Sequence, residues 1–415
     1  MEKSVTPKSN KVSNHIPDDA SLSILSKLSI KSLKRFQCVC KQWSMLFQNP
    51  YFMNIYRNHI IHTNHSDYHD DEVSLILHHA IEVNSSDTPG HGCRSNLYFV
   101  SGDRFENMLK FDFSLPFQVL GPVITIIGST SINGTLCLST FFNDEKHVVL
   151  WNPATDEFNV IPPSPVESSP YRSVVASVHG FGYDQLNDDY KVIRYVEFNS
   201  LTCDELYFRG MSWKDPLFRN VSLEPLWEIY SLKSSTWKKL DVDIPMVFCP
   251  ETSNVLIRFY LDGMCHWCDK IEIDNDGSYF VSFDVSNEVS FTTPLPLDID
   301  DTFDLRSAKR RLVILNESIG LITYSQEMNT LHISVLGEIG VKESWTKLFI
   351  IGSLSFVDYP VEAGRNGDLF LVKKDGELAC FNLVTQMVME LGVVGSMIQM
   401  VIYKRSLLSI RGINK

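Results

Sequence analysis

Two cysteines separated by two residues are the first feature that could do chemistry. Cys265 and Cys268 form a C-x-x-C motif with His266 between them. Thiolate and imidazole ligands suit zinc, but a structural zinc site needs a second pair of ligands at a fitting distance, and the sequence offers none. In GMCHWCDKIEI the residue types alternate as in a strand. We therefore expect buried strand residues here and no bound metal.

Two other segments resemble parts of known ligand sites. Residues 274–277 (DNDG) resemble the start of a calcium loop but lack the later bidentate acid of an EF-hand. Residues 128–134 (GSTSING) are not followed by the lysine and helix of a phosphate loop. Both segments predict turns. No nucleophile elbow, H-E-x-x-H helix or acid pair for general acid–base catalysis stands out, so we expect a chain that is not an enzyme and binds no cofactor.

A histidine-rich segment precedes the first long run of alternating residues. Histidine clusters can bind transition metals. These spacings do not follow one helix face, and Cys93 is the only nearby thiol, so we interpret residues 60–95 as a solvated connector. Within it, SLILHHAIEV could instead form a strand that packs on the following domain. The histidines are His62, His65, His69, His78, His79 and His91.

Charge divides the chain into two parts. Residues 1–60 hold nine Lys or Arg and three Asp or Glu, a net +6, so a total of -13 leaves -19 for the remainder. An acidic body would repel phosphates, which argues against nucleic acid, whereas a basic front end suits an acidic protein partner. No apolar stretch approaches the roughly 18 residues of a membrane span. We expect no membrane association and a cytoplasmic or nuclear chain with reduced cysteines.

Short amphipathic helices are predicted between Pro17 and Phe47. Asp18 or Asp19 can cap the first helix. In the second, apolar residues recur every three positions while basic residues occupy the other side. Asn49-Pro50 ends the third helix and can start a fourth. Helices this short are marginal alone, so an external partner is expected to stabilise them.

The segment IPDDASLSILSKLSIKSLKRFQCVCKQWSMLFQNPYF resembles an F-box. It departs from the usual pattern at Ala20, Ser29 and Lys34, where leucine, proline and an apolar residue are common. In that family these helices bind a Skp-type linker protein, which connects to a cullin-RING ubiquitin ligase. The resemblance implies linker binding through Ile16, Pro17, Ile24, Leu25, Leu28, Leu33, Arg35, Phe36, Val39, Cys40 and Trp43.

An alternative is that these helices merely cap the following domain. The chain would then be an enzyme or lectin whose propeller binds a small molecule or glycan. Exposure of the surface formed by Leu25, Leu33 and Phe36 would favour docking, because unpartnered apolar patches usually mark interfaces. Burial of the same stripe would favour the cap.

From Asn96 onward, short alternating apolar runs are broken by Asp, Asn, Gly and Pro, which is typical of strands and hairpins. A unit of strand, polar turn and strand recurs, and its markers are 79, 53, 52 and 46 residues apart. Three intervals are near the roughly 40 to 50 residues of a four-stranded propeller blade. We predict a multidomain chain in which a small all-α helical module precedes an all-β repeat domain, a β-propeller of about six blades. The markers are Trp151, Tyr230, Phe283, Val335 and Phe381.

The segments LWNPATDEFNVIPPSP and IYSLKSSTWKKL resemble the F-box-associated domain of plant F-box proteins of the S-locus F-box-like group, which is similar to Kelch-type propellers. The glycine pairs of Kelch repeats are missing. The predicted order is a disordered tail at 1–15, an F-box at 16–59, the connector at 60–95 and the F-box-associated domain at 96–410. The resemblance implies a non-catalytic substrate receptor that captures a protein target for ubiquitylation and proteasomal degradation.

The insertion GMSWKDPLFRNVSLEPLW is the most unusual connection of the β region. Binding residues concentrate on loops presented by a rigid scaffold, and aromatic and arginine side chains suit protein interfaces. We hypothesise that Trp213, Phe218 and Arg219 contact the target. Alternatively, the aromatic residues pack the insertion onto its own blade. The acidic body would attract a basic target.

Overall fold

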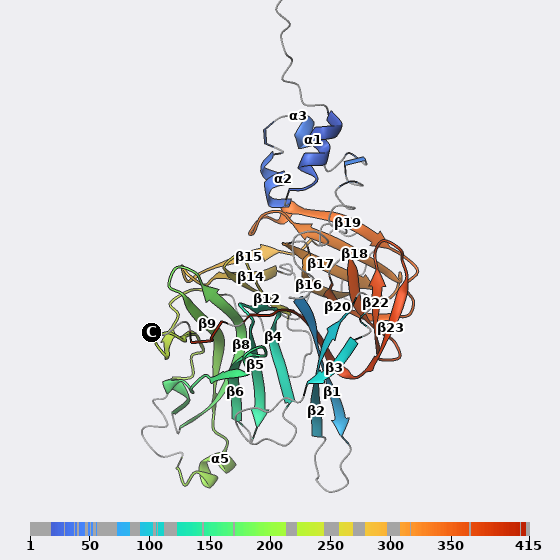
Figure 1. The fold of residues 1–415 in the computed structure, drawn as a ribbon. Helices are drawn as coiled ribbons and strands as arrows, with labels where there is room; N and C mark the ends of the chain where they lie inside the picture. The colour runs from blue at the N-terminus through green and yellow to red at the C-terminus, as the bar shows by residue number, and fades with distance from the viewer. Residues whose placement is uncertain are drawn as a thin grey trace, which may run out of the picture.

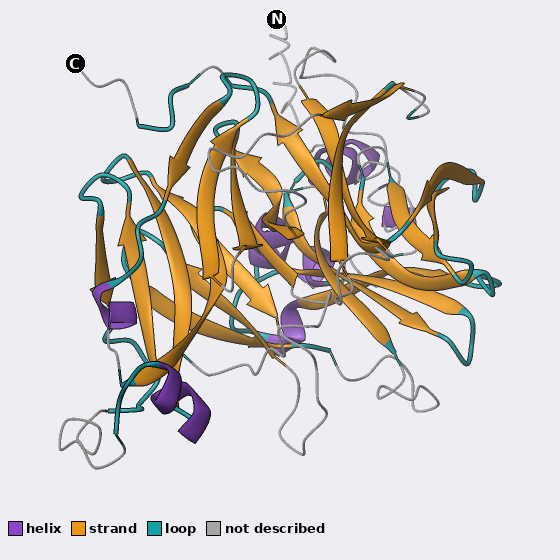
Figure 2. Ribbon diagram, turned by 90° about the horizontal axis from the view of Figure 1, so that it is seen from below, coloured by secondary structure: helices purple, strands orange, loops and turns teal. Residues whose placement is uncertain are grey.

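The structure is a computed structural model of the 415-residue chain. It describes residues 18–28, 30–36, 38–39, 41–45, 49, 51–52, 55, 73–83, 92–102, 105, 107–111, 123–142, 145–168, 171–212, 222–244, 257–268, 279–296, 308–315, 317–364, 367–406 and 408–411. Within these residues the structure is mostly β-strand with few helices (Figures 1 and 2). No helix among them is long and apolar enough to cross a membrane.

Three short helices lie near the N-terminus, where the sequence predicts helices. They are α1 (Asp18–Leu25), α2 (Ile30–Phe36) and α3 (Lys41–Ser44). After α3, the Asn49 side chain accepts the backbone N–H groups of Tyr51 and Phe52 at 3.0 and 3.3 Å. This arrangement caps a helical turn, because an N-cap oxygen satisfies backbone donors that have no partner within the helix.

One sheet has eight strands and joins the two ends of the β region. Its order is β3-β2-β1-β24-β4-β5-β6-β7. The first half comprises β1 (Val73–Val83), β2 (Gly92–Ser101), β3 (Asn107–Phe111) and β24 (Ser396–Lys404). The second half comprises β4 (Val123–Ile132), β5 (Thr135–Phe142), β6 (Glu145–Asn152) and β7 (Glu157–Val160).

Four further sheets have four antiparallel strands each. The first two contain β8 (Arg172–Asp184), β9 (Asp189–Ser200), β10 (Leu226–Ser231) and β11 (Thr236–Lys239), then β12 (Ile257–Leu261), β13 (Met264–Cys268), β14 (Tyr279–Asp284) and β15 (Val289–Pro294). The last two contain β16 (Lys309–Leu315), β17 (Ser318–Ser325), β18 (Thr330–Leu336) and β19 (Trp345–Ile351), then β20 (Val357–Ala363), β21 (Asp368–Lys373), β22 (Glu377–Asn382) and β23 (Val388–Val394). The remaining helices are α5 (Cys203–Phe208), η3 (Pro165–Ser168) and η4 (Lys342–Ser344).

The last strand closes the β region. β24 pairs antiparallel with β1, with Val401 opposite Ile76, and meets β4 through the parallel pair Ile402 and Thr130. Strand β1 lies inside residues 60–95, for which the sequence favours a solvated connector. The strand alternative for SLILHHAIEV is therefore the one that the structure shows. The β region begins at β1 rather than at Asn96, which lies within β2.

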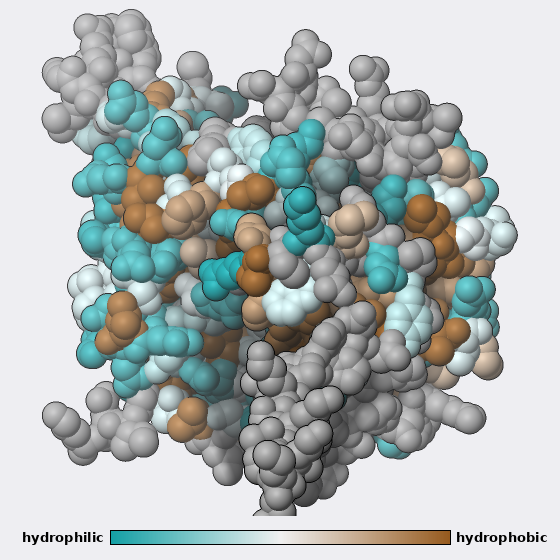
Figure 3. All heavy atoms as spheres, turned by 90° about the horizontal axis from the view of Figure 1, so that it is seen from above, coloured by the Kyte–Doolittle hydropathy of each residue, from teal (hydrophilic) through white to brown (hydrophobic). Residues whose placement is uncertain are grey.

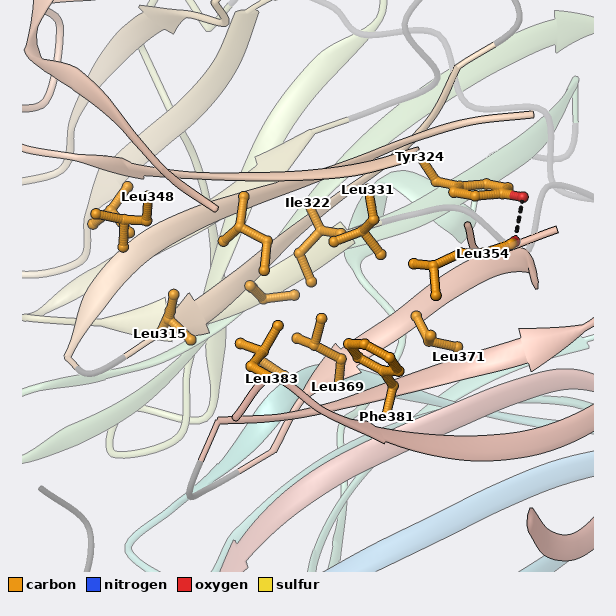
Figure 4. Packing of buried hydrophobic residues seen from close by; sticks show 14 of the residues in the cluster. Leu315, Ile322, Tyr324, Leu331, Leu348, Leu354, Leu369, Leu371, Phe381 and Leu383 are labelled. Carbon is orange, nitrogen blue, oxygen red and sulfur yellow. Dashed lines mark hydrogen bonds between the residues drawn. The ribbon is translucent and has the colours of Figure 1, made fainter. Parts of the chain in front are cut away.

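Successive strand groups contact one another through equivalent strands. Contacts join β4 to β8, β8 to β12, β12 to β16, β16 to β20, β20 to β24 and β24 back to β4. The cycle of contacts is therefore closed. Buried apolar clusters fill the space between neighbouring groups. One of them lies between β16–β19 and β20–β23, where the Tyr324 hydroxyl donates to the Leu354 carbonyl at 2.9 Å (Figure 4).

The polar turns of the predicted repeat unit share one geometry. In one of them the Asp284 carboxylate accepts the backbone N–H groups of Ser286 and Asn287, and Glu288 closes the turn at φ 54°. Asn382 plays the same role before Gln386, at φ 55°. Asp and Asn favour such positions because a short polar side chain can bond to the backbone two residues on. The repeat is therefore a recurring capped hairpin turn.

The motifs with possible metal or phosphate chemistry lie mostly in strands. Cys265 and Cys268 are buried in strand β13, as predicted, and they belong to apolar clusters on opposite sides of the strand. Most of GSTSING belongs to β4, and only Asn133-Gly134 forms a turn, which corrects the prediction of a turn throughout. Residues 274–277 lie outside the described residues. No group of three potential metal ligands occurs in the part of the chain that the structure describes.

Candidate protein-docking surfaces

The N-terminal helices expose several large apolar side chains. Ile24 is 57% exposed and Val39 is 63% exposed, and Met45 and Tyr51 are also exposed. We call these four residues the exposed apolar set. Basic side chains lie exposed on the same segment at Lys27, Arg35 and Lys41. Exposed apolar side chains beside basic ones suit an acidic protein partner.

The other side of these helices packs on the β region. Leu25, Leu33 and Phe52 are buried in one cluster with residues of β16–β22, and Leu33 has no exposed surface. Helix α2 lies against β18, and Figure 1 shows the three helices above β18 and β19. Phe36 and Trp43 are half-buried at the edge of this cluster, in an edge-to-face contact with centroids 5.3 Å apart. The helices are therefore fixed to one sheet.

This packing divides the residues predicted to bind the linker. Ile24, Arg35 and Val39 are exposed, and Leu28, Phe36 and Trp43 are half-buried. Leu25 and Leu33 are buried against the β region, whereas Phe36 is half-buried. The surface formed by these three residues, whose exposure would favour docking, is therefore only partly exposed. The Leu25 and Leu33 side chains pack the helices on the sheet, and their contact with the linker stays a prediction. Ile16, Pro17 and Cys40 lie outside the described residues.

Seen from the end that carries these helices, hydrophobic residues lie in separate patches among hydrophilic ones (Figure 3). The apolar surface that is visible among the described residues at this end is therefore divided into small patches. A partner there would combine small apolar contacts with polar ones, as protein interfaces commonly do.

The insertion predicted to bind the target is described only in part. Trp213, Phe218 and Arg219 lie outside the described residues. Directly before them is helix α5, which the sequence reasoning missed. Its signal was present in the sequence as Thr202 followed three residues later by Glu205. The Thr202 hydroxyl accepts from the Glu205 N–H at 3.3 Å, and the Glu205 carboxylate accepts from the Thr202 N–H at 2.7 Å, which completes a capping box.

Helix α5 exposes two aromatic side chains on an anchored base. Leu201 and Leu206 are buried beneath it. Tyr207 is 81% exposed and Phe208 is 84% exposed, with ring centroids 6.0 Å apart. At the far end of the insertion, the Arg172 guanidinium donates to the Ser222 carbonyl at 2.9 Å. Large exposed aromatic pairs are uncommon, because burying such rings is favourable.

Several buried ionisable groups have evident structural partners. Arg194 forms ion pairs with Glu228 and Glu167, and its guanidinium lies 4.0 Å from the centre of the Trp237 ring. Burial raises the pKa of Glu362 to about 7, although Arg311 lies 4.0 Å away and opposes the shift. These groups lie within or between sheets. We find no arrangement of nucleophile and base among the described residues.

The histidines of the presumed connector also have a structural place. His78 and His79 are buried in β1, and His79 stacks on Tyr98 with centroids 5.6 Å apart. Burial lowers the pKa of His78 to about 4. A neutral imidazole inside a sheet contributes to packing, so these two residues belong to the β region.

Comparison with protein families decides what the chain is. The family model described as the F-box domain matches residues 14–54, and the model described as the F-box associated beta propeller domain matches residues 123–406, more than half of the chain. The chain belongs to the F-box-associated β-propeller family. It is thus an F-box protein, as the sequence resemblance implied, and its β region is the F-box-associated propeller.

Relatives of this F-box protein occur in Arabidopsis thaliana. An F-box protein of that plant is 28% identical over 342 residues, which cover 81% of this chain and 73% of the relative. An F-box/kelch-repeat protein is 24% identical over 387 residues, with 89% and 88% covered. The F-box/WD-40 repeat-containing protein 1 is 24% identical over 361 residues, with 83% and 70% covered.

Among solved structures, TolB from Acinetobacter baumannii is similar to this F-box protein at a TM-score of 0.44 and 11% identity. The similarity covers 85% of this chain and 72% of TolB. At that score the similarity is too weak to inform function.

Proposed function

We propose that this F-box protein is the substrate-receptor subunit of a Skp-cullin-F-box ubiquitin ligase. The observation that carries the proposal is an F-box whose helices are fixed to the propeller on one side and expose Ile24, Val39, Met45 and Tyr51 on another. The protein performs no chemistry itself. It raises the effective concentration of a target near the conjugating enzyme, in the cytoplasm or nucleus.

We infer that the propeller has six blades. The eight-stranded sheet divides at the single parallel pair between β24 and β4 into two groups of four strands. With the four separate sheets, this gives six groups joined in a closed cycle of contacts. The first blade combines β1, β2 and β3 with β24 from the other end of the chain, which leaves no open edge at the seam.

The target is captured away from the F-box. The F-box helices lie at one end of the molecule and α5 at the other in Figure 1. The proposed target residues Trp213, Phe218 and Arg219 follow α5 directly in the sequence. A target bound there would leave the exposed apolar set of the F-box free for the linker.

Substituting Ile24 and Val39 by aspartate should abolish linker binding. Buried apolar interface anchors contribute about 2 kcal/mol or more each, so the loss of both, about 4 kcal/mol, should weaken binding by roughly 800-fold or more. Isothermal titration of the full chain with a purified plant Skp-type linker measures this. Both side chains are exposed, so the substitutions should leave the fold intact.

The matched control is Leu109→Asp, which places the same charge at an exposed apolar position on β3 of the propeller. It should bind the linker like the natural chain. Equal binding of the linker by the natural chain and the Ile24/Val39 variant would show that these two residues do not contact the linker. A natural chain that does not bind the linker would favour the cap alternative, which the burial of Leu25 and Leu33 supports.

A further inference from the structure

We propose that strands β4–β7 carry a peptide-binding site whose ligand is this chain's own C-terminal segment, residues 405–411. We call this segment the C-terminal strap. It directly follows β24, and Leu407 within it lies outside the described residues. None of its described residues belongs to a strand. Side chains rather than sheet pairing therefore hold the strap, and the inference is independent of the proposed function.

Asn152, the last residue of β6, binds the backbone of the strap. Its side chain is buried. The amide nitrogen donates to the carbonyl groups of Ser406 and Leu408 at 3.0 and 2.9 Å, while the amide oxygen accepts the Ala154 N–H at 3.0 Å. An asparagine amide has two donors and one acceptor oxygen. The bond to Ala154 therefore fixes the amide in the orientation that directs both donors at the strap.

Two other residues of the same strand group fit the strap closely. Glu157, the first residue of β7, accepts the Ser409 hydroxyl at 2.8 Å with one oxygen and the Ile410 N–H at 2.9 Å with the other. Gly134, in the turn between β4 and β5, has φ 77°, and a Cβ atom there would lie 2.7 Å from the Ser406 Cβ atom. The strap thus lies where the turn has no side chain.

Ile410 is the apolar anchor of the strap. It is 1% exposed and belongs to a cluster that combines residues of β4–β7, such as Ile132, with residues of β8–β11, such as Val192. Leu408 in the same segment is 51% exposed. The strap therefore starts at β24, crosses β4–β7 and ends between that group and β8–β11, so it connects three neighbouring strand groups.

The strap continues the seam between β24 and β4 beyond the end of β24. These two strands share a single backbone pair. The Gln399 amide adds two hydrogen bonds to the Ile126 backbone at 3.0 and 3.2 Å, and the Ser131 hydroxyl accepts the Lys404 N–H at 2.9 Å. Because the strap is not part of a sheet, it can open locally while the strands stay paired. Its release should loosen this seam.

Hydrogen exchange of the full-length chain, measured by mass spectrometry of peptic fragments, tests these contacts. The Asn152→Asp variant keeps the acceptor for Ala154 but replaces the donor with an acceptor that repels the two strap carbonyl groups. Amides of the strap should then exchange at least about tenfold faster, because two hydrogen bonds to a buried group are lost. Exchange in β24 should also become faster, since the seam is loosened.

Ile410→Ser and Leu408→Ser are a matched pair of full-length variants. The first removes the buried anchor and should accelerate exchange of the strap at least about tenfold, whereas the second removes an exposed side chain and should leave the exchange unchanged. Exchange as slow in the Asn152→Asp and Ile410→Ser variants as in the natural chain would overturn the inference. Equal acceleration by Ile410→Ser and Leu408→Ser would also overturn it.

A chain that ends at Lys404 tests whether the strap is a separable ligand. If this chain folds, a labelled synthetic peptide with the sequence of residues 405–415 should bind it, as measured by fluorescence polarisation. The peptide with Ile410→Ser should bind at least about tenfold more weakly, and the peptide with Leu408→Ser should bind like the natural peptide. A folded chain that does not bind the peptide at millimolar concentration would overturn the inference. If the shortened chain does not fold, the exchange of the full-length variants decides.

Discussion

Lowering the pH from 7 to 4 should strongly destabilise the propeller. His78, His179 and His266 are buried, and burial lowers their pKa values to about 4, about 3 and about 4. In the unfolded chain they take up protons near pH 6.5. Their stabilising contribution is therefore complete above that pH and is lost as the pH falls toward the folded-state values. Each contributes roughly 3 kcal/mol or more over this window.

One buried carboxyl opposes this trend. The pKa of Glu362 is raised by burial to about 7, so the folded state holds a proton that the unfolded chain releases. Its contribution favours the folded state as the pH falls below 7, by roughly 3 kcal/mol at most. The three histidines outweigh it. Stability should therefore still decrease steadily between pH 6.5 and pH 4.

Urea unfolding at several pH values, followed by tryptophan fluorescence, measures the effect. Trp227 lies 4.8 Å from His179 between ring centroids and reports on that site. The His179→Phe variant should show a weaker pH dependence, because one titrating group is gone. An unfolding midpoint that stays constant from pH 7 to pH 4.5 would contradict the burial of these histidines.

The Leu33→Ala variant should loosen the F-box from the propeller at a cost of about 2 to 5 kcal/mol. Leu33 has no exposed surface and belongs to the cluster that joins α1 and α2 to β16–β22. Truncation leaves a cavity that the surrounding helices and strands fill only in part. Hydrogen exchange of the α2 backbone amides should become faster, and the urea midpoint should fall.

Ile24→Ala is the matched control for this effect. Ile24 lies on α1 next to buried Leu25 but is 57% exposed, so its truncation should cost less than about 1 kcal/mol. We expect Leu33→Ala to lower the stability of the fold and Ile24→Ala to lower the affinity for the linker. Equal loss of stability in both variants would show that Leu33 is not in a core shared with the propeller.

Local patterns in the sequence were enough to predict the F-box helices and most of the strands. Spacing of apolar residues marks each element, and Asp and Asn mark the capped hairpin turns such as that at Asp284. The pairing of β1 with β24 could not be seen in this way. Those strands are more than 300 residues apart, and no local pattern records a contact at that distance.

The orientation of the F-box helices on the propeller also could not be predicted from the sequence. An apolar stripe indicates that a helix is covered, but it does not indicate whether a linker or a neighbouring sheet covers it. Leu33 faces β18 and its neighbours, whereas Ile24 and Val39 remain exposed. Helix α5 had a sequence signal in its capping box.

The fixed F-box has a consequence for how a target is held. Because α2 packs directly on β18, the propeller cannot turn freely relative to a bound linker. A target at α5 would then be held at a constant distance and orientation from the rest of the ligase. If the protein is the proposed substrate receptor, this arrangement would favour ubiquitylation of lysines on one side of the target.

Assembly with a purified Skp-type linker and cullin tests the central proposal most directly. Size-exclusion chromatography with light scattering measures the mass of the complex. We expect the natural chain to form a complex with one copy of each protein and the Ile24→Asp/Val39→Asp variant to elute alone. A natural, folded chain that elutes apart from the linker at micromolar concentration would contradict it.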